Sequence, residues 1–288
     1  MELKEAFPIK GKTTMRIGGA VKAYAMLQTR GDCQQAVATA AEKKLPLIVL
    51  GSGSNTLFAD GDIAAMVVQI GNTASALEGN RVTVGGGKNL AMLINELAKQ
   101  DLDLSALTGI PGTVGGALFG NAGQGPKGIW IDTYVVSVTA LMDGQWRTMT
   151  REECNFRYRE SAFKDHATPS IIWEAVLDVP SRPGAEVKAN VDALLQKRIE
   201  TQPHLKTAGS CFKAVGGTPA WQLLDAAGLR GLRIGGVEIS PKHANFLINV
   251  GEATYADAKA VVEQAKKAVP DRLEVEMRFI ENDGSAAY

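Results

Sequence analysis

The glycine-rich stretch at residues 109–123 constrains the fold more than any other segment. It begins Gly-Ile-Pro-Gly-Thr-Val-Gly-Gly-Ala, holds six glycines in fifteen residues and carries almost no charge. Glycine loses more conformational entropy on folding than any other residue, so such a segment is costly to order. A ligand that touches the bare backbone would offset this cost, and a buried structural turn is the alternative.

A second glycine segment, Gly51-Ser52-Gly53-Ser54-Asn55, directly follows the apolar run at residues 47–50. Glycines allow backbone N–H groups to point together into an anion-binding nest, and the serine and asparagine side chains can add donors. A tight polar turn fits this segment equally well. It matches neither the dinucleotide-binding fingerprint nor the P-loop. The two segments are therefore candidates for holding a diphosphate.

Hydrophobic periodicity and turn signals predict an α+β architecture, with a ligand-binding part of about 200 residues and a smaller C-terminal block. Strands are predicted at residues 21–28, 47–50, 65–70, 81–85, 133–142, 145–149, 170–179, 246–250 and 273–280. Helices are predicted at residues 32–44, after the cap Asn89, and at residues 189–200, 221–227 and 254–269. The last helix opens with Thr254-x-x-Asp257 and is expected to end at Pro270, while residues 202–209 resemble a linker.

Composition narrows the function classes. The 31 basic residues balance 31 acidic ones, so we expect neither nucleic acid nor a membrane surface as partner. No apolar run reaches the roughly 20 residues that span a bilayer, and the acidic N-terminus predicts no signal peptide. Three distant cysteines favour a reducing cytoplasm, and their spacing predicts no metal site. Nothing indicates an obligate protein partner.

The two glycine segments, about sixty residues apart, are together similar to the FAD-binding fold of the vanillyl-alcohol-oxidase type. Further motifs follow in order along nearly the whole chain, and the complete series resembles the UDP-N-acetylenolpyruvoylglucosamine reductase family. These motifs are Thr13-Thr14-Met15-Arg16-Ile17-Gly18-Gly19, Tyr158-Arg159-Glu160-Ser161, Ala208-Gly209-Ser210-Cys211-Phe212-Lys213, Gly228-Leu229-Arg230-Gly231 to Gly235-Gly236, Lys242-His243-Ala244-Asn245-Phe246 and Leu273-Glu274-Val275-Glu276-Met277-Arg278.

The resemblance implies an FAD-binding fold in two α/β subdomains, residues 1–68 and 69–200, and a C-terminal α+β substrate-binding lobe at residues 201–288. It implies FAD as cofactor, NADPH as co-substrate and a UDP-sugar as substrate. The residues expected to bind the cofactor are Gly51, Ser52, Gly53, Ser54, Asn55, Ile110, Pro111, Gly112, Thr113, Gly115, Gly116 and Asn121.

The implied reaction is the NADPH-dependent reduction of UDP-N-acetylglucosamine enolpyruvate to UDP-N-acetylmuramate in peptidoglycan precursor synthesis. Such a site needs a cation and a polarising group at the carboxylate, and a proton donor at the neighbouring carbon. The resemblance assigns Arg159 to the carboxylate, Ser210 to the proton and Glu276 to polarising the developing enolate. It also places Tyr158 and Lys213 near the substrate.

From the residues alone, each of these assignments has an ordinary alternative. Arg159 could be a surface residue with Arg157 as its competitor, Ser210 a small residue entering a strand, and Glu276 part of a solvated strand edge. The chain also departs from the family pattern. Ala214 stands where the family usually has an asparagine that contacts the substrate's diphosphate, and the chain lacks a long insertion with a tyrosine that closes over the substrate.

Two other functions remain open at this point. One is an FAD oxidase or dehydrogenase of the same fold that acts on a small hydroxy acid or sugar lactone, and the other is a non-enzymatic binder of nucleotide sugars. The motifs between Ser210 and Arg278 favour the reductase.

Overall fold

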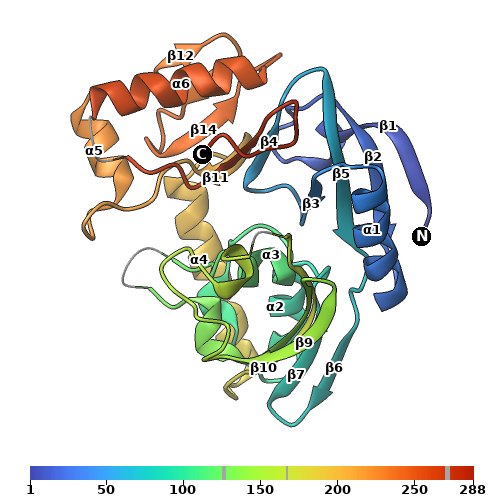
Figure 1. Ribbon diagram of the computed structural model, residues 1–288. Coiled ribbons are helices and arrows are strands. Elements are labelled where there is room, and N and C mark those ends of the chain that lie inside the picture. The colour runs from blue at the N-terminus through green and yellow to red at the C-terminus, as the bar shows by residue number, and fades with distance from the viewer. Residues whose placement is uncertain (125–127, 167, 270–272) are drawn as a thin grey trace. The chain divides into compact units, whose positions relative to one another are not determined.

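The computed structural model describes residues 1–124, 128–166, 168–269 and 273–288. The chain divides into two compact units (Figure 1). The first unit comprises Met1–Leu3, Ala25–Gly51 and Val67–Lys197, and the second comprises Lys4–Tyr24, Ser52–Met66 and Arg198–Tyr288. The division falls within strands β2 (Ala20–Leu27) and β5 (Asp62–Ile70), which share a sheet of order β1-β2-β5-β3. The division at residues 68 and 200 stays a prediction.

The first unit is built on a sheet of order β6-β7-β10-β8-β9. Strand β10 (Ile171–Asp178) pairs antiparallel with both β7 (Arg81–Gly85) and β8 (Val135–Met142). The strands predicted at residues 133–142 and 145–149 form a hairpin of β8 and β9 (Gln145–Thr150), and both turn residues, Asp143 and Gly144, have positive φ, as in a two-residue hairpin turn. The sheet therefore provides a rigid base for the loops that follow its strands.

The helices of this unit follow local signals in the sequence. Helix α1 (Arg30–Glu42) begins at the cap Thr29, and helix α2 (Leu90–Ala98) begins at Asn89, whose side chain accepts the N–H of Met92. The apolar face of α2 enters the core of the unit with Leu90, Leu93, Ile94 and Leu97. Strand β3 (Leu47–Val49) precedes the first glycine segment, and α4 (Gly184–Thr201) follows β10.

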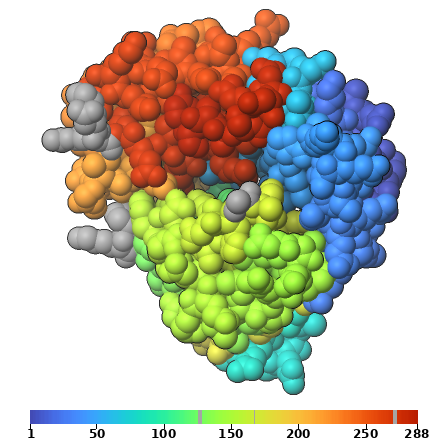
Figure 2. All heavy atoms as spheres, in the orientation of Figure 1, coloured from blue at the N-terminus to red at the C-terminus, as the bar shows by residue number. Residues whose placement is uncertain are grey.

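The second unit holds a sheet of order β11-β14-β13-β12, in which β11 (Lys206–Ser210) pairs antiparallel with β14 (Phe246–Asn249). Helix α6 (Tyr255–Ala268) opens with the predicted capping box between Thr254 and Asp257, and its outer face forms part of the surface in Figure 2. Helix α5 (Ala220–Ala226) is followed by Gly228, whose φ is positive. Strand β15 (Arg278–Ile280) pairs in parallel with β4 (Thr56–Phe58) directly after the first glycine segment.

Several predictions of local structure were wrong. The linker predicted at residues 202–209 contains most of β11, because the sheet supplies hydrogen bonds to a segment without local strand signals. The strand predicted at residues 273–280 is regular only in β15, and Val275 forms a single bridge with Phe212. The second glycine segment contains an unpredicted helix, α3 (Val114–Phe119). Pro270, expected to end α6, lies outside the described residues.

Besides β11, five short strands were not predicted: β1 (Leu3–Pro8), β4, β6 (Ser75–Glu78), β12 (Arg233–Ile234) and β13 (Val237–Ile239). Their pairing partners are needed to define them, since runs this short carry little periodicity. Over the part of the chain that the structure describes, no helix is both long and apolar enough to cross a bilayer.

Candidate active site

Within the first unit, the two glycine segments approach each other at Thr113. A Cβ atom on Gly51 would lie only 2.8 Å from Oγ1 of Thr113. The same oxygen accepts the N–H of Gly116 at 3.2 Å and so caps the start of α3. Among the described residues outside its own helix backbone and chain neighbours, a Cβ atom on Gly116 would meet only this oxygen within 4 Å, at 3.3 Å. The backbone of this segment is therefore packed on one side and open on the other.

The packed side rests on the run Gly85-Gly86-Gly87, which the sequence analysis did not single out. The N–H of Gly115 donates to the carbonyl oxygen of Gly86 at 2.8 Å, and a Cβ atom on Gly115 would lie 2.9 Å from that oxygen. A Cβ atom on Gly86 would lie 2.2 Å from the carbonyl oxygen of Ile172 in β10. These glycines allow three backbone segments to stack closely. The sequence signal that could have indicated this close packing is the run of three glycines at the end of the strand predicted at residues 81–85.

Tyr158 and Arg159 form the tip of a tight turn in the first unit. The N–H of Arg157 donates to the carbonyl oxygen of Glu160 at 2.9 Å, and the reverse bond measures 3.2 Å. Arg159 has φ of 60°, in the left-handed region where a side chain is strained. Its guanidinium carbon lies 5.7 Å from the ring centroid of Tyr158, which in turn lies 5.5 Å from the ring of Trp130.

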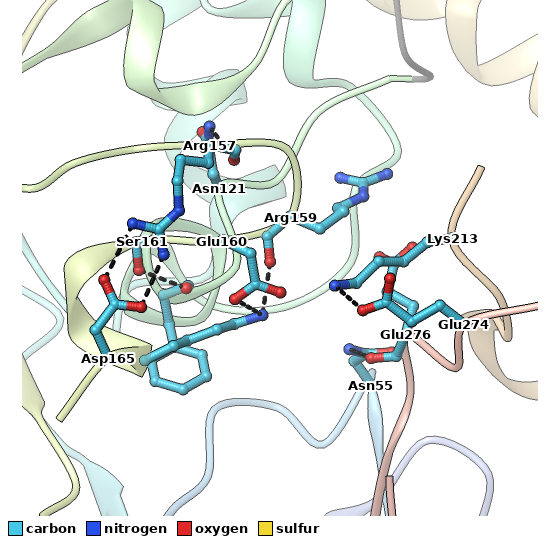
Figure 3. A network of polar contacts seen from close by, with 12 residues as sticks. Asn55, Asn121, Arg157, Arg159, Glu160, Ser161, Asp165, Lys213, Glu274 and Glu276 are labelled. Atoms are coloured by element: carbon cyan, nitrogen blue, oxygen red, sulfur yellow. Dashed lines mark hydrogen bonds and ion pairs between the residues drawn. The ribbon is translucent and has the colours of Figure 1, made fainter. Parts of the chain in front are cut away.

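Side chains beneath the turn hold it in this conformation (Figure 3). The ammonium of Lys164 donates to the carbonyl oxygen of Arg159 at 2.6 Å. The hydroxyl of Ser161 donates to the carbonyl oxygen of Phe119 at 2.8 Å. Buried Asn121 donates to the carbonyl oxygen of Arg157 at 3.1 Å and accepts the N–H of Asp132 at 3.3 Å. Asn121, predicted to bind the cofactor, thus supports the turn that carries Arg159.

The structure distinguishes Arg159 from its competitor Arg157. The exposed guanidinium of Arg157 forms a bidentate ion pair with Asp165, with N···O distances of 2.7 and 3.1 Å. Hydrogen bonding to Asp165 raises the pKa of Arg157, and the same contact lowers the pKa of Asp165. Arg157 is therefore engaged in a surface ion pair.

Within the second unit, the rest of the first glycine segment packs against residues near the N-terminus. Gly53 has φ of 64°, and a Cβ atom on it would lie 2.2 Å from the carbonyl oxygen of Lys12. The N–H of Thr14 donates to the carbonyl oxygen of Gly53 at 3.1 Å. Glycine is needed here both for its backbone conformation and for the close approach.

Asn55 connects this loop to the segment that carries Glu276. Its side-chain amide donates to the main-chain carbonyl oxygen of Glu276 at 3.0 Å, as Figure 3 shows. The main-chain carbonyl oxygen of Asn55 accepts the N–H of Arg278, also at 3.0 Å. Asn55 was predicted to bind the cofactor directly. In the structure, its side chain also fixes the backbone at the predicted catalytic glutamate.

Ser210 and Glu276 lie on neighbouring segments of the second unit. The N–H of Glu276 donates to the carbonyl oxygen of Cys211 at 2.8 Å. The backbone N–H of Lys213 donates to the carbonyl oxygen of Glu274 at 2.9 Å. The ammonium of Lys213 forms an ion pair with exposed Glu274 at 2.5 Å. Cys211 is fully buried, and burial raises the pKa of its thiol. The structure thus brings Ser210, Lys213, Glu276 and Asn55 into one neighbourhood.

Asn245 holds this neighbourhood in place and was not predicted as a site residue. Its buried side chain accepts the N–H of Phe212 and donates to the carbonyl oxygen of Phe212, both at 2.9 Å. His243, two residues earlier, packs edge-on against Phe246 with ring centroids 4.6 Å apart. Burial, and then the charge of Arg230, lower the pKa of His243. His243 therefore contributes to packing in the second unit.

Comparisons with known proteins identify the family. A model described as the FAD binding domain matches residues 21–150, which include both glycine segments. A model described as the C-terminal domain of UDP-N-acetylenolpyruvoylglucosamine reductase matches residues 202–280, which include Ser210, Lys213 and Glu276. The reductase of Moorella thermoacetica is 35% identical over 94% of this chain and 90% of its own length. The chain belongs to the UDP-N-acetylenolpyruvoylglucosamine reductase family.

Other members of the UDP-N-acetylenolpyruvoylglucosamine reductase family agree with this assignment. The reductase of Bacillus subtilis is 32% identical over 94% of this chain and 90% of its own length. The crystal structure of the reductase from Thermus caldophilus matches with a TM-score of 0.83 and 32% identity, covering 96% of this chain and 98% of that one. The resemblance predicted from the sequence motifs is confirmed.

The fold prediction is also confirmed. 6-Hydroxy-D-nicotine oxidase from Arthrobacter nicotinovorans matches 62% of this chain and 42% of its own, with a TM-score of 0.50 and 20% identity. At 20% identity this match shows a shared fold and nothing about function.

Proposed function

We propose that this chain reduces UDP-N-acetylglucosamine enolpyruvate to UDP-N-acetylmuramate with NADPH, by way of bound FAD, in peptidoglycan precursor synthesis. The observation that carries the proposal is the match to reductases of this family over about nine-tenths of both chains. It includes the FAD binding domain and the C-terminal domain particular to the family. We also propose a cytoplasmic location, since the three cysteines are free thiols, as is usual in a reducing compartment.

The two glycine segments fit a flavin dinucleotide. The space beside the backbone at Gly116 and the left-handed backbone at Gly53 suit a ligand that approaches the main chain closely. When bound there, FAD would supply the hydride chemistry. We propose that it is held by Gly51, Ser52, Gly53, Ser54, Asn55, Ile110, Pro111, Gly112, Thr113, Gly115, Gly116 and Asn121.

We assign Arg159 to the carboxylate of the enolpyruvyl group. A guanidinium keeps its charge at all relevant pH values and can bind a carboxylate through two parallel hydrogen bonds. The strained backbone at Arg159 and the Lys164 contact beneath it support this role, because strain of this kind gathers at functional sites. Tyr158, adjacent in the same turn, would contact the substrate as well.

We assign Ser210 to proton delivery at the carbon next to the carboxylate, and Glu276 to polarising the enolate that develops there. An isolated serine hydroxyl is a poor acid, so its role depends on precise placement and on a neighbouring polar group. The hydrogen bond between Glu276 and Cys211 keeps the two segments side by side. Lys213 would contact the substrate, and Ala214 supplies no diphosphate donor from its side chain.

The proposal is tested by the two half-reactions measured separately. The purified protein should show flavin absorbance that NADPH bleaches and that the enolpyruvyl sugar restores in a stopped-flow instrument. Ser210→Ala should retain flavin reduction by NADPH but slow the restoration by about 10²-fold or more. A colourless protein that takes up no FAD, or a reduced flavin that the sugar does not reoxidise, would contradict the proposed function. Equal losses in both half-reactions would contradict the role of Ser210.

A further inference from the structure

Strand β11 reaches Ser210 through a β-bulge. Thr207 pairs with Ile248 and Ser210 with Phe246, so three steps along β11 oppose two steps along β14. The bulge contains Gly209, whose φ of 77° is in the left-handed region. A bulge re-aims the side chains beside it, and bulges are common next to active sites. The direction of the Ser210 side chain therefore depends on how firmly this bulge is held.

Side chains hold the bulge on both sides, and within it the N–H of Gly209 donates to the hydroxyl oxygen of Thr207 at 3.3 Å. After it, Asn245 bonds both polar backbone groups of Phe212 at 2.9 Å. Before it, the hydroxyl of Thr14 donates to the carbonyl oxygen of Thr207 at 2.7 Å, across 193 residues of sequence. Thr14 belongs to the motif at residues 13–19, for which the proposed function gives no role.

Thr14 also holds the glycine loop at residues 52–55. Its N–H donates to the carbonyl oxygen of Gly53 at 3.1 Å, and its hydroxyl lies 3.2 Å from that same oxygen and 2.7 Å from the carbonyl oxygen of Thr207. The loop and the bulge lie against each other at this point, since a Cβ atom on Gly209 would lie 3.9 Å from the carbonyl oxygen of Ser54. One threonine thus joins the loop to the strand that carries Ser210.

Asn55 completes a ring of hydrogen bonds. It donates to the carbonyl oxygen of Glu276 at 3.0 Å, and the N–H of Glu276 donates to Cys211 at 2.8 Å, one residue after Ser210. From Cys211 the chain runs back along β11 to Thr207, whose carbonyl oxygen accepts the hydroxyl of Thr14. Each hydrogen bond of the ring joins groups that are distant in sequence, so the ring fixes the loop together with Ser210 and Glu276.

We propose that Thr14 is a positioning residue that holds Ser210 and the loop at residues 52–55 in a single arrangement. The proposal rests on the proposed function for the roles of Ser210 and of this loop. Thr14 acts through the backbone at Thr207 and Gly53. Its loss should therefore weaken FAD binding and also slow the step that uses Ser210.

The test compares Thr14→Val with Thr14→Ser in the full-length FAD enzyme. Valine has nearly the volume of threonine and keeps the backbone N–H bond to Gly53, so it removes only the contacts of the hydroxyl with Thr207 and Gly53, whereas serine keeps the hydroxyl. For Thr14→Val we expect about 2- to 10-fold weaker FAD binding and a similar slowing of flavin reoxidation by the enolpyruvyl sugar. Flavin reduction by NADPH in the FAD-saturated enzyme should stay close to wild type. Thr14→Ser should restore both properties.

A double variant tests whether Thr14 acts through Ser210. In a Ser210→Ala background, Thr14→Val should cause no further slowing of reoxidation, while FAD binding should still weaken. Additive slowing in the double variant would overturn this part of the proposal. Wild-type FAD affinity and reoxidation in Thr14→Val, with or without a lower melting temperature, would overturn all of it.

Failure of the proposed function gives a different result. In that case the wild-type reduced flavin is not reoxidised by the enolpyruvyl sugar at all. The FAD titration of Thr14→Val then decides alone: weaker binding that serine restores supports the link between Thr14 and the loop, and unchanged binding overturns it.

Discussion

Arg159 occupies a backbone conformation that costs a non-glycine residue about 1–2 kcal/mol. The surrounding contacts maintain it, because Lys164 binds the carbonyl oxygen of Arg159 itself and Asn121 binds that of Arg157. Arg157, two residues earlier, lies in an exposed ion pair with Asp165. The neighbouring arginines therefore differ in environment, and a matched pair of substitutions can separate their roles.

Arg159→Lys should slow reoxidation of the reduced flavin by the enolpyruvyl sugar on the order of 10²-fold, because an ammonium cannot reproduce the two parallel bonds of a guanidinium. Arg157→Lys should change the same rate by no more than about twofold, since exposed ion pairs contribute little. Stopped-flow absorbance measures both variants. Equal rates in the two variants would remove the reason to assign the carboxylate to Arg159.

Gly53 and Gly228 offer a second matched pair, since both have left-handed backbone. Within the part of the chain that the structure describes, a Cβ atom on Gly228 would meet nothing within 4 Å beyond its chain neighbours, whereas one on Gly53 would lie 2.2 Å from the carbonyl oxygen of Lys12. Gly228→Ala should lower the free energy of unfolding by about 1 kcal/mol and retain FAD. Gly53→Ala should lower it further and release FAD. Urea unfolding and flavin content after gel filtration give the answer, and equal behaviour would refute a role for this close approach.

At the level of elements, local sequence signals correctly predicted the caps and turns that are formed by local interactions. The cap at Asn89, the turn at Asp143 and the capping box at Thr254 depend on neighbours within four residues, and each lies where the sequence analysis placed it. Helix α3 could not be predicted in this way. Its glycine-rich sequence disfavours a helix, but Gly115 packs on the backbone of Gly86 in a distant part of the chain.

The same distinction applies to the candidate site. Ser210 and Glu276 were predicted only by family resemblance, since neither has a distinctive local pattern. Thr14 and Asn245 stand in the family motifs, but no role was predicted for them, because their partners lie 193 and 33 residues away and depend on the fold. Motifs therefore predicted the residues assigned to chemistry, and the structure added the residues that hold them.

The start of α6 has a pH-dependent contribution to stability. Burial would raise the pKa of Asp257, but N–H groups of Gly236 and Thr254 and the Thr254 hydroxyl lower it below its ordinary value. A lowered folded-state pKa means that the carboxylate stabilises the protein above the unfolded value, about 3.9, and that this contribution is lost as the pH falls through the folded value.

Asp257→Asn should therefore lower the free energy of unfolding by about 1 kcal/mol at pH 7, with a smaller difference below about pH 4. Urea unfolding midpoints from pH 3 to pH 7 measure this difference. As a control, Asp62→Asn changes an exposed carboxylate of the same unit and should show a much smaller effect. A loss for Asp257→Asn that does not vary with pH would mean that the charge of the carboxylate is not the source of stability.

For the whole molecule, the boundary between the two units falls between Gly51 and Ser52, inside the first glycine segment. The second glycine segment belongs entirely to the first unit. Residues of both glycine segments are proposed to bind FAD. Since binding to the native state alone stabilises it by mass action, FAD should affect the stability of both units.

Hydrogen exchange with and without FAD tests this directly. Backbone amides at residues 51–55 and at residues 109–116 should exchange more slowly when FAD is present, because ligand contacts suppress local opening. The hairpin turn at Asp143 and Gly144 serves as an internal control and should be unchanged, since it carries no proposed ligand contact. Protection confined to one segment would exclude the other from cofactor binding. Protection at 51–55 without 109–116 would leave Thr113, Gly115 and Gly116 with a packing role only.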